Sequence, residues 1–338
     1  MIYFDVTKSG SVRHRSGLAR LSERLREELG DQATAATWLD VRKRARPEDW
    51  FVTTELFSEA ERPGFGDFLR RPPCHTAAVF ADAIPMKFPH ITWPQSVARH
   101  PNYLKMLAGF EKVWAISGAS RDELRGYWEW LGLERVPGIN VLPLGADLRG
   151  ISRRDQRGSP SLRGLLCVGI IEPRKNQMFL LEVCEELWNS GIKFNLHIVG
   201  RINPHFGAPI VQRIKLLRRR FIGLRYHEAV DDNVLAKLYG SVRATVFPTI
   251  AEGCGLPLLE SLWQGVPCVC SNLPVLRENA DGGGCLTPRV NSHEEWREAL
   301  YSVLKDDELH ARLRHEAVTR ELPTWAETAK RLRNGLKI

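Results

Sequence analysis

The chain has 338 residues, of which 43% are hydrophobic and 26% charged, and its formal net charge at pH 7 is +8. This length exceeds one ordinary hydrophobic core and predicts two domains of roughly 150 residues, with the composition of a folded globular protein. No apolar run reaches the roughly 20 residues that would span a bilayer, and seven cysteines without a Cys-x-x-Cys pair argue against a disulfide framework or a structural zinc site.

The basic residues are clustered, which limits the classes of partner. Such clusters suit nucleic acid, an anionic membrane surface or an anionic substrate. We expect no nucleic-acid partner, because zinc-finger spacing, RRM-like aromatic motifs and basic helices leading into heptads are all missing from the sequence. Peripheral membrane contact stays open, and cysteines in apolar runs favour a reducing, cytoplasmic setting. The clusters are Arg13 and Arg15; Arg20, Arg24 and Arg26; Arg42, Lys43, Arg44 and Arg46; and Arg213, Lys215 and 218–220.

The first half of the chain alternates strand and helix patterns. Residues 1–7 predict a strand, a loop with glycines follows, and leucines recur at helical spacing until Gly30 ends the helix. The N–H group of Gly17 at this helix start could bind an anion, although Ser16 alone would explain an ordinary N-cap. Alternation of this kind predicts a parallel sheet covered on both faces. Further strands are expected over 37–41, 77–84, 113–117 and 139–144.

A polar, aperiodic stretch over 150–160 predicts a linker, and the alternation then restarts. The second half is therefore expected to be another doubly wound α/β domain, with ligands at the carboxyl ends of both sheets. Its expected strands are 164–171, 194–199, 244–247, 266–270 and 285–286, and its expected helices are 177–188 and one from residue 256.

Residues 249–260 join the strand at 244–247 to the next helix through a glycine loop flanked by two glutamates, Glu252 and Glu260. Gly253 and Gly255 let a ligand approach the backbone, and the helix start offers unpaired N–H groups. Taken alone, the pattern is equally consistent with a purely structural role for both glutamates. In that case Glu260 would interact favourably with the helix dipole, and Glu252 would lie in a solvated turn.

Four segments of the second half, which follow one another along the chain as they do in the family, resemble the family 4 retaining glycosyltransferases. This family has the GT-B fold of two Rossmann-like domains facing a cleft. Residues 252–260 are similar to the family's Glu-Gly-Phe-Gly-Leu-Pro-x-x-Glu element. Residues 168–176 resemble its strand-end loop with a phosphate-binding lysine. Residues 271–278 and 286–288 are similar to the segments that close the family's second domain.

The first half resembles the family more loosely. The matching stretches are 16–20, 117–122 (with Asp122 one place early), 143–147 and 324–326, the last at the start of a final helix that crosses back onto the first domain. The resemblance implies an acceptor-side domain over 1–147 plus 325–338 and a nucleotide-sugar domain over 148–324.

The resemblance also implies a role for each matching residue. Glu252 would hold hydroxyls of the donor sugar, Glu260 would bind the ribose, and Lys175 with Arg174 would neutralise the pyrophosphate. Glu252 and Lys175 are the expected catalytic residues. The sequence contains no Asp-x-Asp motif, so we expect no metal and no cofactor besides the sugar donor. The remaining donor-binding positions would be Gly17, Gly169, Gly253, Cys254, Gly255 and Leu256.

Two positions depart from the family pattern. Ile170 stands where many relatives carry an arginine, and Ala81 stands where a histidine often contacts the donor sugar near its 6-hydroxyl, beside Asp82. Loss of such a contact would remove a preference for that hydroxyl. We therefore hypothesise a pocket at Ala81 and Asp82 for a deoxysugar or pentose, unless His75 or His90 fills the same space or the register differs.

The expected activity is retaining transfer of a sugar from a nucleoside diphosphate to a glycan, a lipid-linked acceptor or a secondary metabolite. Two alternatives remain at this point. One is a sugar-nucleotide epimerase or phosphorylase of the same fold, and the other is a binding protein that has kept the nucleotide site but lost transfer.

Overall fold

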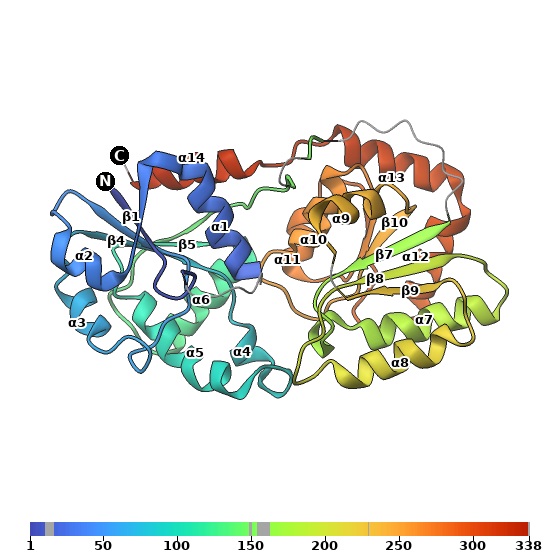
Figure 1. Cartoon of the computed structure of the whole chain (residues 1–338), viewed down its shortest axis with the longest axis horizontal. Helices are drawn as coiled ribbons and strands as arrows, with labels where there is room; N and C mark the ends of the chain where they lie inside the picture. Colours follow the sequence, from blue (N-terminus) through green and yellow to red (C-terminus); the bar gives the residue numbers. More distant parts are fainter. Residues whose placement is uncertain (11–16, 149–150, 154–162, 229, 337–338) are drawn as a thin grey trace. The chain divides into compact units, whose positions relative to one another are not determined.

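The computed structural model describes residues 1–10, 17–148, 151–153, 163–228 and 230–336. The chain divides into two compact units (Figure 1). The first contains Met1–Gly145 and Pro323–Ile338, and the second contains Ala146–Leu322. None of the helices in these described ranges is both long and apolar enough to cross a membrane.

The first unit is built on a six-stranded sheet in which every pair of neighbouring strands is parallel. The order is β2-β1-β3-β4-β5-β6, so the chain turns from one side of β1 to the other after β2. This reversal makes the carboxyl ends of β1 and β3 the switch point of the sheet. The strands are β1 (Ile2–Asp5), β2 (Ala33–Ala36), β3 (Trp50–Thr53), β4 (His75–Phe80), β5 (Lys112–Ala115) and β6 (Ile139–Val141).

The last helix of the chain belongs to the first unit, as the sequence predicts. It packs against α1 (Figure 1), and the Thr328 hydroxyl donates to the Pro143 carbonyl at 2.8 Å. A Cβ atom at Gly145 would lie 2.2 Å from the Trp325 nitrogen, so only glycine allows this close approach. The helices are α1 (Gly17–Leu29), α2 (Trp38–Arg44), α3 (Phe65–Arg70), α4 (Ile84–Lys87), α5 (Pro94–Leu107), α6 (Gly118–Trp130) and α14 (Trp325–Leu336), with 3-10 turns η1 (Gly30–Gln32) and η2 (Pro89–Ile91).

Two sequence predictions in this unit are wrong. The strand expected over 37–41 is the helix α2, because the Thr37 side chain accepts the Asp40 N–H and Asp40 in turn accepts the Thr37 N–H. This reciprocal cap starts a helix where the apolar residues alone suggested a strand. The strand expected over 77–84 ends at Phe80, and Ile84 already begins α4.

The second unit repeats the architecture with a parallel sheet in the order β12-β11-β10-β7-β8-β9. The strands are β7 (Gly164–Val168), β8 (Asn195–Val199), β9 (Leu224–His227), β10 (Ala244–Phe247), β11 (Cys268–Cys270) and β12 (Cys285–Leu286). The helices are α7 (Gln177–Asn189), α8 (Ala208–Arg218), α9 (Asp232–Tyr239), α10 (Leu256–Trp263), α11 (Pro274–Ala280), α12 (His293–Lys305) and α13 (Asp307–Thr319), with the turn η3 (Pro173–Lys175).

The order of this second sheet places its switch point between β7 and β10. The chain builds β7, β8 and β9 outward on one side and then returns to pair β10 with the other side of β7. The loops that follow β7 and β10 therefore leave the same edge of the sheet side by side, where open parallel sheets bind ligands. Both loops carry residues that the sequence analysis selects.

Candidate functional site

Direct hydrogen bonds join the two loops at the switch point of the second sheet. The Ile250 N–H donates to the Arg174 carbonyl at 2.9 Å, and the Thr249 hydroxyl lies 3.0 Å from the same oxygen. Residues some 75 positions apart in sequence thus share one small site.

Glu252 is the centre of this site. Its Oε1 atom accepts from Lys175 Nζ at 2.6 Å, from Arg174 Nη1 at 3.0 Å and from the Thr249 hydroxyl at 2.8 Å. Lys175 is buried, and its ammonium also lies 4.8 Å from the centre of the Phe247 ring. The contacts of Glu252 with other described side chains all involve Oε1, which leaves Oε2 as the oxygen that can accept from a ligand.

The charges in this cluster stabilise one another. Burial favours a raised pKa for Glu252, but Lys175 and Arg174, together with hydrogen bonds from Lys175 and Thr249, outweigh it and lower that pKa. Burial lowers the pKa of Lys175, and the Glu252 carboxylate opposes this shift. The site therefore holds an ionised carboxylate beside two cations.

A further acid orients the guanidinium of Arg174. Glu172 Oε1 accepts from Arg174 Nε at 3.0 Å and lies 2.7 Å from its Nη2, while Glu172 Oε2 accepts from Asn203 Nδ2 at 2.9 Å. The remaining edge of the guanidinium points at Glu252 and at the Ala251 carbonyl, 2.9 Å away. Arg174 is therefore held in one orientation, as a planar fork that bonds two groups at once.

Glycine is required at two positions around this cluster. At Gly169 (φ +155°), a Cβ atom would contact the stem of Lys175 at 3.4 Å. Gly255 is the N-cap of α10 with φ +87°, and a Cβ atom there would lie 2.5 Å from Leu276 Cδ2. Gly169 lets the Lys175 stem lie against the loop backbone, and Gly255 lets the start of α10 pack closely against Leu276 of α11.

The other predicted residues of the loop lie on or beside α10. Glu260 is buried in the second turn of α10, with Oε2 3.4 Å from the hydroxyl of Tyr239 on α9. Burial raises the pKa of the Cys254 thiol to about 12, so the side chain stays protonated near neutral pH. The backbone carbonyl of Cys254 accepts a hydrogen bond from Asn279 Nδ2 at 2.6 Å. Cys254 can therefore offer a ligand its backbone but no thiolate.

The predicted sugar pocket, Ala81 and Asp82, follows β4 in the first unit. The Ala81 carbonyl accepts from the Ser120 hydroxyl at 2.7 Å, and Asp82 Oδ1 accepts the Ile84 N–H at 3.0 Å. A histidine that contacts this segment is His100 on α5, whose Nε2 lies 3.0 Å from the Asp82 carbonyl. His100 is not among the residues expected from the sequence.

The structure contradicts one alternative proposed for this pocket. His75 begins β4, whereas Ala81 follows its carboxyl end, so the His75 ring cannot fill the space at Ala81. That ring instead contacts Glu111 Oε2 at 2.6 Å. His90 is exposed on η2.

His100 should make stability depend on pH. Burial lowers its pKa to about 4, below the 6.5 of an ordinary histidine, although the Asp82 carbonyl opposes the shift. The unfolded chain then binds the extra proton between these two values, so stability should fall as pH decreases from 6.5 toward 4, by up to about 3 kcal/mol. The free energy of unfolding, measured with urea across this pH range, should fall less steeply with decreasing pH in His100→Gln than in the wild type. His90→Gln is the control, and equal slopes in all three proteins would contradict the assignment.

Gly17 is the first residue of α1, and Ser16 lies outside the described residues.

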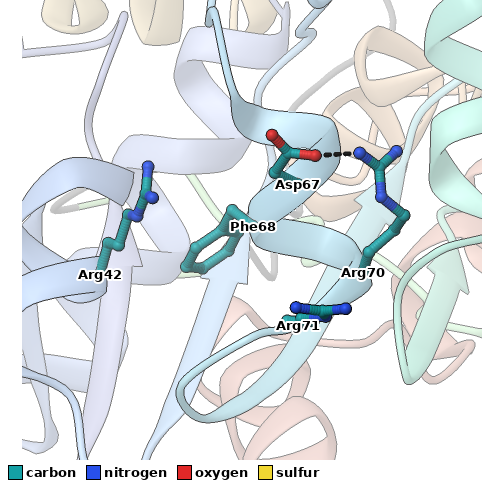
Figure 2. Close-up of a pocket in the computed structure, with 5 residues that line it drawn as sticks. All are labelled: Arg42, Asp67, Phe68, Arg70 and Arg71. Carbon is teal, nitrogen blue, oxygen red and sulfur yellow. Dashed lines mark hydrogen bonds and ion pairs between the residues drawn. The ribbon is translucent and has the colours of Figure 1, made fainter.

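A separate basic surface occurs elsewhere in the first unit, as a hollow of ≈ 510 Å³ lined by Arg42, Asp67, Phe68, Arg70 and Arg71 (Figure 2). Asp67 pairs with Arg70. The hollow joins the predicted Arg42 cluster to two arginines from the end of α3. Peripheral membrane contact stays a prediction, which sedimentation with anionic vesicles would test.

Several residues that hold the predicted ones in place were not expected from the sequence. These are Thr249, Tyr239, Glu172 and Asn203. Thr249 offered a signal, because a hydroxyl residue directly follows β10 and Pro248, three places before Glu252. Tyr239 and Asn203 offered none, since each reaches the site from another element. Glu172 lies in the loop over 168–176, two places before Arg174, but nothing in its spacing marks it as the partner of that guanidinium.

Comparison with known proteins identifies a family and several relatives of the chain. Residues 153–320 match the family model described as Glycosyl transferases group 1. The chain is 25% identical over 292 residues to the serotype-specific mannosyltransferase WbdA of Escherichia coli, a match that covers 80% of this chain and 35% of that protein. It is 33% identical over 143 residues to the O-antigen chain mannosyltransferase B of Escherichia coli, a match that covers 42% of this chain and 37% of that protein. The chain thus spans about a third of the length of these curated relatives.

Solved structures share the fold over the whole chain. Anabaena Alr3699/HepE in complex with UDP has a TM-score of 0.75 at 12% identity, and the match covers 99% of each chain. The sucrose-phosphate synthase of Thermosynechococcus elongatus has a TM-score of 0.70 at 14% identity, covering 98% of this chain and 81% of that one. At these identities the likeness establishes the fold alone, which is the predicted GT-B fold.

Proposed function

The chain belongs to the group 1 glycosyltransferases, family 4, with the GT-B fold, and on this premise we propose that it moves a sugar, with retention, from a nucleoside diphosphate to a hydroxyl of a glycan acceptor. The observation that carries the proposal is the Glu252 carboxylate held by Lys175 and Arg174 at the switch point of the second sheet. An anionic donor and a hydroxyl-rich sugar both find partners there.

The two cations would serve the leaving group. When the bond to the sugar breaks, negative charge builds on the nucleoside diphosphate, and a fixed cation beside it lowers the barrier. Lys175 and Arg174 lie in the loop after β7, and Arg174 contacts Ala251 and Glu252 in the loop that leads into α10. We propose that these groups replace a metal ion and that no cofactor is used.

Glu252 and Glu260 would divide the remaining recognition. Oε2 of Glu252 would accept from a hydroxyl of the donor sugar while Oε1 keeps the cations in place. Glu260 would accept from the ribose hydroxyls, and the Tyr239 hydroxyl beside it would help to set the orientation of the carboxylate.

The relatives guide the choice of substrates. Both curated proteins described above are named mannosyltransferases, and one is named for the O-antigen chain. We therefore propose a mannosyl donor and a polysaccharide acceptor. Mannose keeps its 6-hydroxyl, so the hypothesis of a deoxysugar or pentose donor at Ala81 has no support from these relatives.

A donor screen tests this function. The protein is incubated with GDP-mannose, UDP-mannose, dTDP-mannose or ADP-mannose, each with and without a mannan acceptor. Release of the nucleoside diphosphate is measured. We expect release from one donor that requires the acceptor and persists in chelator. A 6-deoxy donor of the same base should react more slowly.

The alternatives give different results in the same screen. A rearranged sugar nucleotide without acceptor would indicate an epimerase, and dependence on inorganic phosphate would indicate a phosphorylase. Binding of a donor with no turnover under any condition would indicate a binding protein. Each of these outcomes would overturn the proposal.

A further inference from the structure

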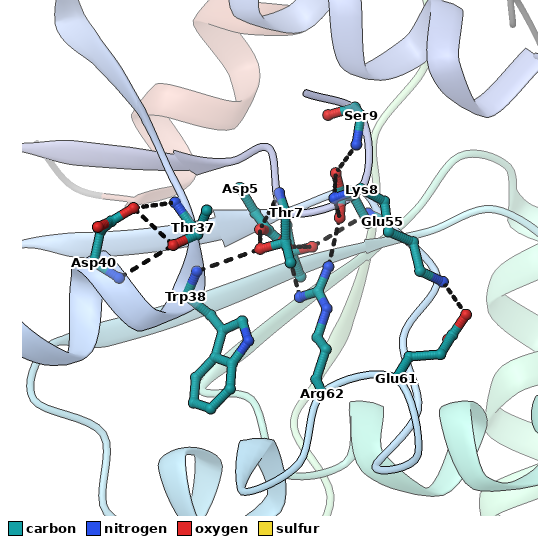
Figure 3. A network of polar contacts seen from close by, with 11 residues as sticks. Asp5, Thr7, Lys8, Ser9, Thr37, Trp38, Asp40, Glu55, Glu61 and Arg62 are labelled. Atoms are coloured by element: carbon teal, nitrogen blue, oxygen red, sulfur yellow. Dashed lines mark hydrogen bonds and ion pairs between the residues drawn. The ribbon is translucent and has the colours of Figure 1, made fainter. Parts of the chain in front are cut away.

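The switch point of the first sheet is filled by a buried ionic network (Figure 3). Asp5 ends β1, Thr53 ends β3, and Glu55 follows two residues later. Asp5 Oδ2 accepts from Arg62 Nη1 at 2.8 Å and from the Thr53 hydroxyl at 2.6 Å. Arg62 Nη2 donates to Glu55 Oε2. A guanidinium of this chain therefore lies at the carboxyl ends of β1 and β3, the edge at which such sheets bind ligands.

The two acids of the network also hold the turn after β1. The Thr7 N–H donates to Asp5 Oδ1 at 3.1 Å. The Lys8 N–H donates to Glu55 Oε2 at 2.8 Å, and the Ser9 N–H donates to Glu55 Oε1 at 2.7 Å. The Gly10 N–H closes the turn on the Val6 carbonyl at 3.0 Å. Four consecutive N–H groups are thus satisfied, two of them by one side chain.

Glu55 acts here as an internal anion. Consecutive N–H groups in a turn form a concave site that binds anions, and in this chain the site is occupied by the chain's own carboxylate. Burial, followed by the Asp5 charge, raises the pKa of Glu55, and the N–H groups of Ser9 and Lys8 oppose that rise. Arg62 is fully buried, with its guanidinium 5.5 Å and 5.2 Å from the rings of Phe57 and Phe65, so its orientation is fixed by packing.

We propose that Glu55 is a positioning residue for the glycan acceptor, because it fixes the turn of residues 6–10 at the edge of the first sheet where a ligand would bind. The inference rests on the proposed function, together with the expectation from the sequence that residues 1–147 belong to the acceptor-side domain. Glu55 acts through the turn and touches no reacting atom.

Glu55→Gln, with Glu61→Gln as the matched control, tests the proposal. Glu61 binds the Lys8 ammonium at 2.8 Å and Arg99, but it accepts no N–H group of the turn. Amide hydrogen exchange at Lys8 and Ser9 should accelerate about tenfold or more in Glu55→Gln, as expected for the loss of one charged hydrogen bond. The acceptor KM should rise by a similar factor, while the nucleotide Kd, set by the second unit, should stay unchanged.

The remaining outcomes also decide the matter. Faster exchange with an unchanged acceptor KM would mean a merely structural role and would overturn the proposal, as would equal effects in the Glu61 variant. If Glu55→Gln does not fold, Glu55→Asp keeps the charge for Arg62 on a shorter arm and should still raise the acceptor KM. A wild-type protein that transfers no sugar would refute the proposed function, whereas the exchange data would still report whether Glu55 holds the turn.

Discussion

Replacing Lys175 with alanine should lower kcat/KM for sugar transfer by about 10²- to 10³-fold, the range seen when one preorganised stabiliser of developing charge is removed. The ammonium is buried and hydrogen-bonded to Glu252 at 2.6 Å, so the variant loses a cation that the fold holds in a fixed position. Steady-state kinetics with a saturating acceptor would measure the loss.

Lys193→Ala is the control for this experiment, because Lys193 is an exposed lysine of the same unit. Within the described part of the chain, the Lys175 variant also leaves Glu252 paired with Arg174 alone, which should destabilise the fold. Thermal unfolding therefore accompanies the kinetics, so that lost activity is scored on folded protein. A Lys175→Ala enzyme that is folded and retains more than about a third of wild-type kcat/KM would show that the lysine does not serve the leaving group.

The two glutamates of the glycine loop should separate into different kinetic classes. Glu252→Gln should reduce kcat about 100-fold with little change in nucleotide affinity, because the amide keeps the shape but loses the charge that orders Lys175 and Arg174. Glu260→Ala should weaken nucleotide binding about tenfold or more, because it removes the buried carboxylate that we propose accepts the ribose hydroxyls. Calorimetric titration with the nucleoside diphosphate and steady-state kinetics would separate the two effects.

Glu298→Ala, an exposed glutamate on α12, should change neither property. The reverse pattern, with Glu260 controlling turnover and Glu252 controlling affinity, would refute the assignment of roles.

The fold was accessible from the sequence because its signals are local. Leu21, Leu25 and Leu29 recur at helical spacing and are all buried on α1. Runs such as 244–247 are buried along their whole length, as central parallel strands are. The failure at 37–41 has a local cause too, since the reciprocal cap of Thr37 and Asp40 outweighed an apolar run that was ambiguous between strand and helix.

The candidate site was accessible only in part. The glycines and glutamates of 252–260 and the lysine after β7 could be selected because their spacing resembles a known element. Their partners could not be selected. Tyr239 reaches Glu260 from α9, and Asn203 reaches Glu172 from the loop after β8. No spacing in the sequence links these pairs.

By itself, the sequence determined that this chain forms two α/β units and that a glycine loop with two glutamates begins a helix after a buried strand. These features depend on periodicity, capping and backbone freedom within a few neighbouring residues. Only the tertiary structure decided that Lys175, Arg174 and Thr249 meet on one oxygen of Glu252, and that Arg62 and Glu55 fill the switch point of the first sheet. The order of strands in a sheet sets these encounters, and that order follows from contacts between residues far apart in the chain.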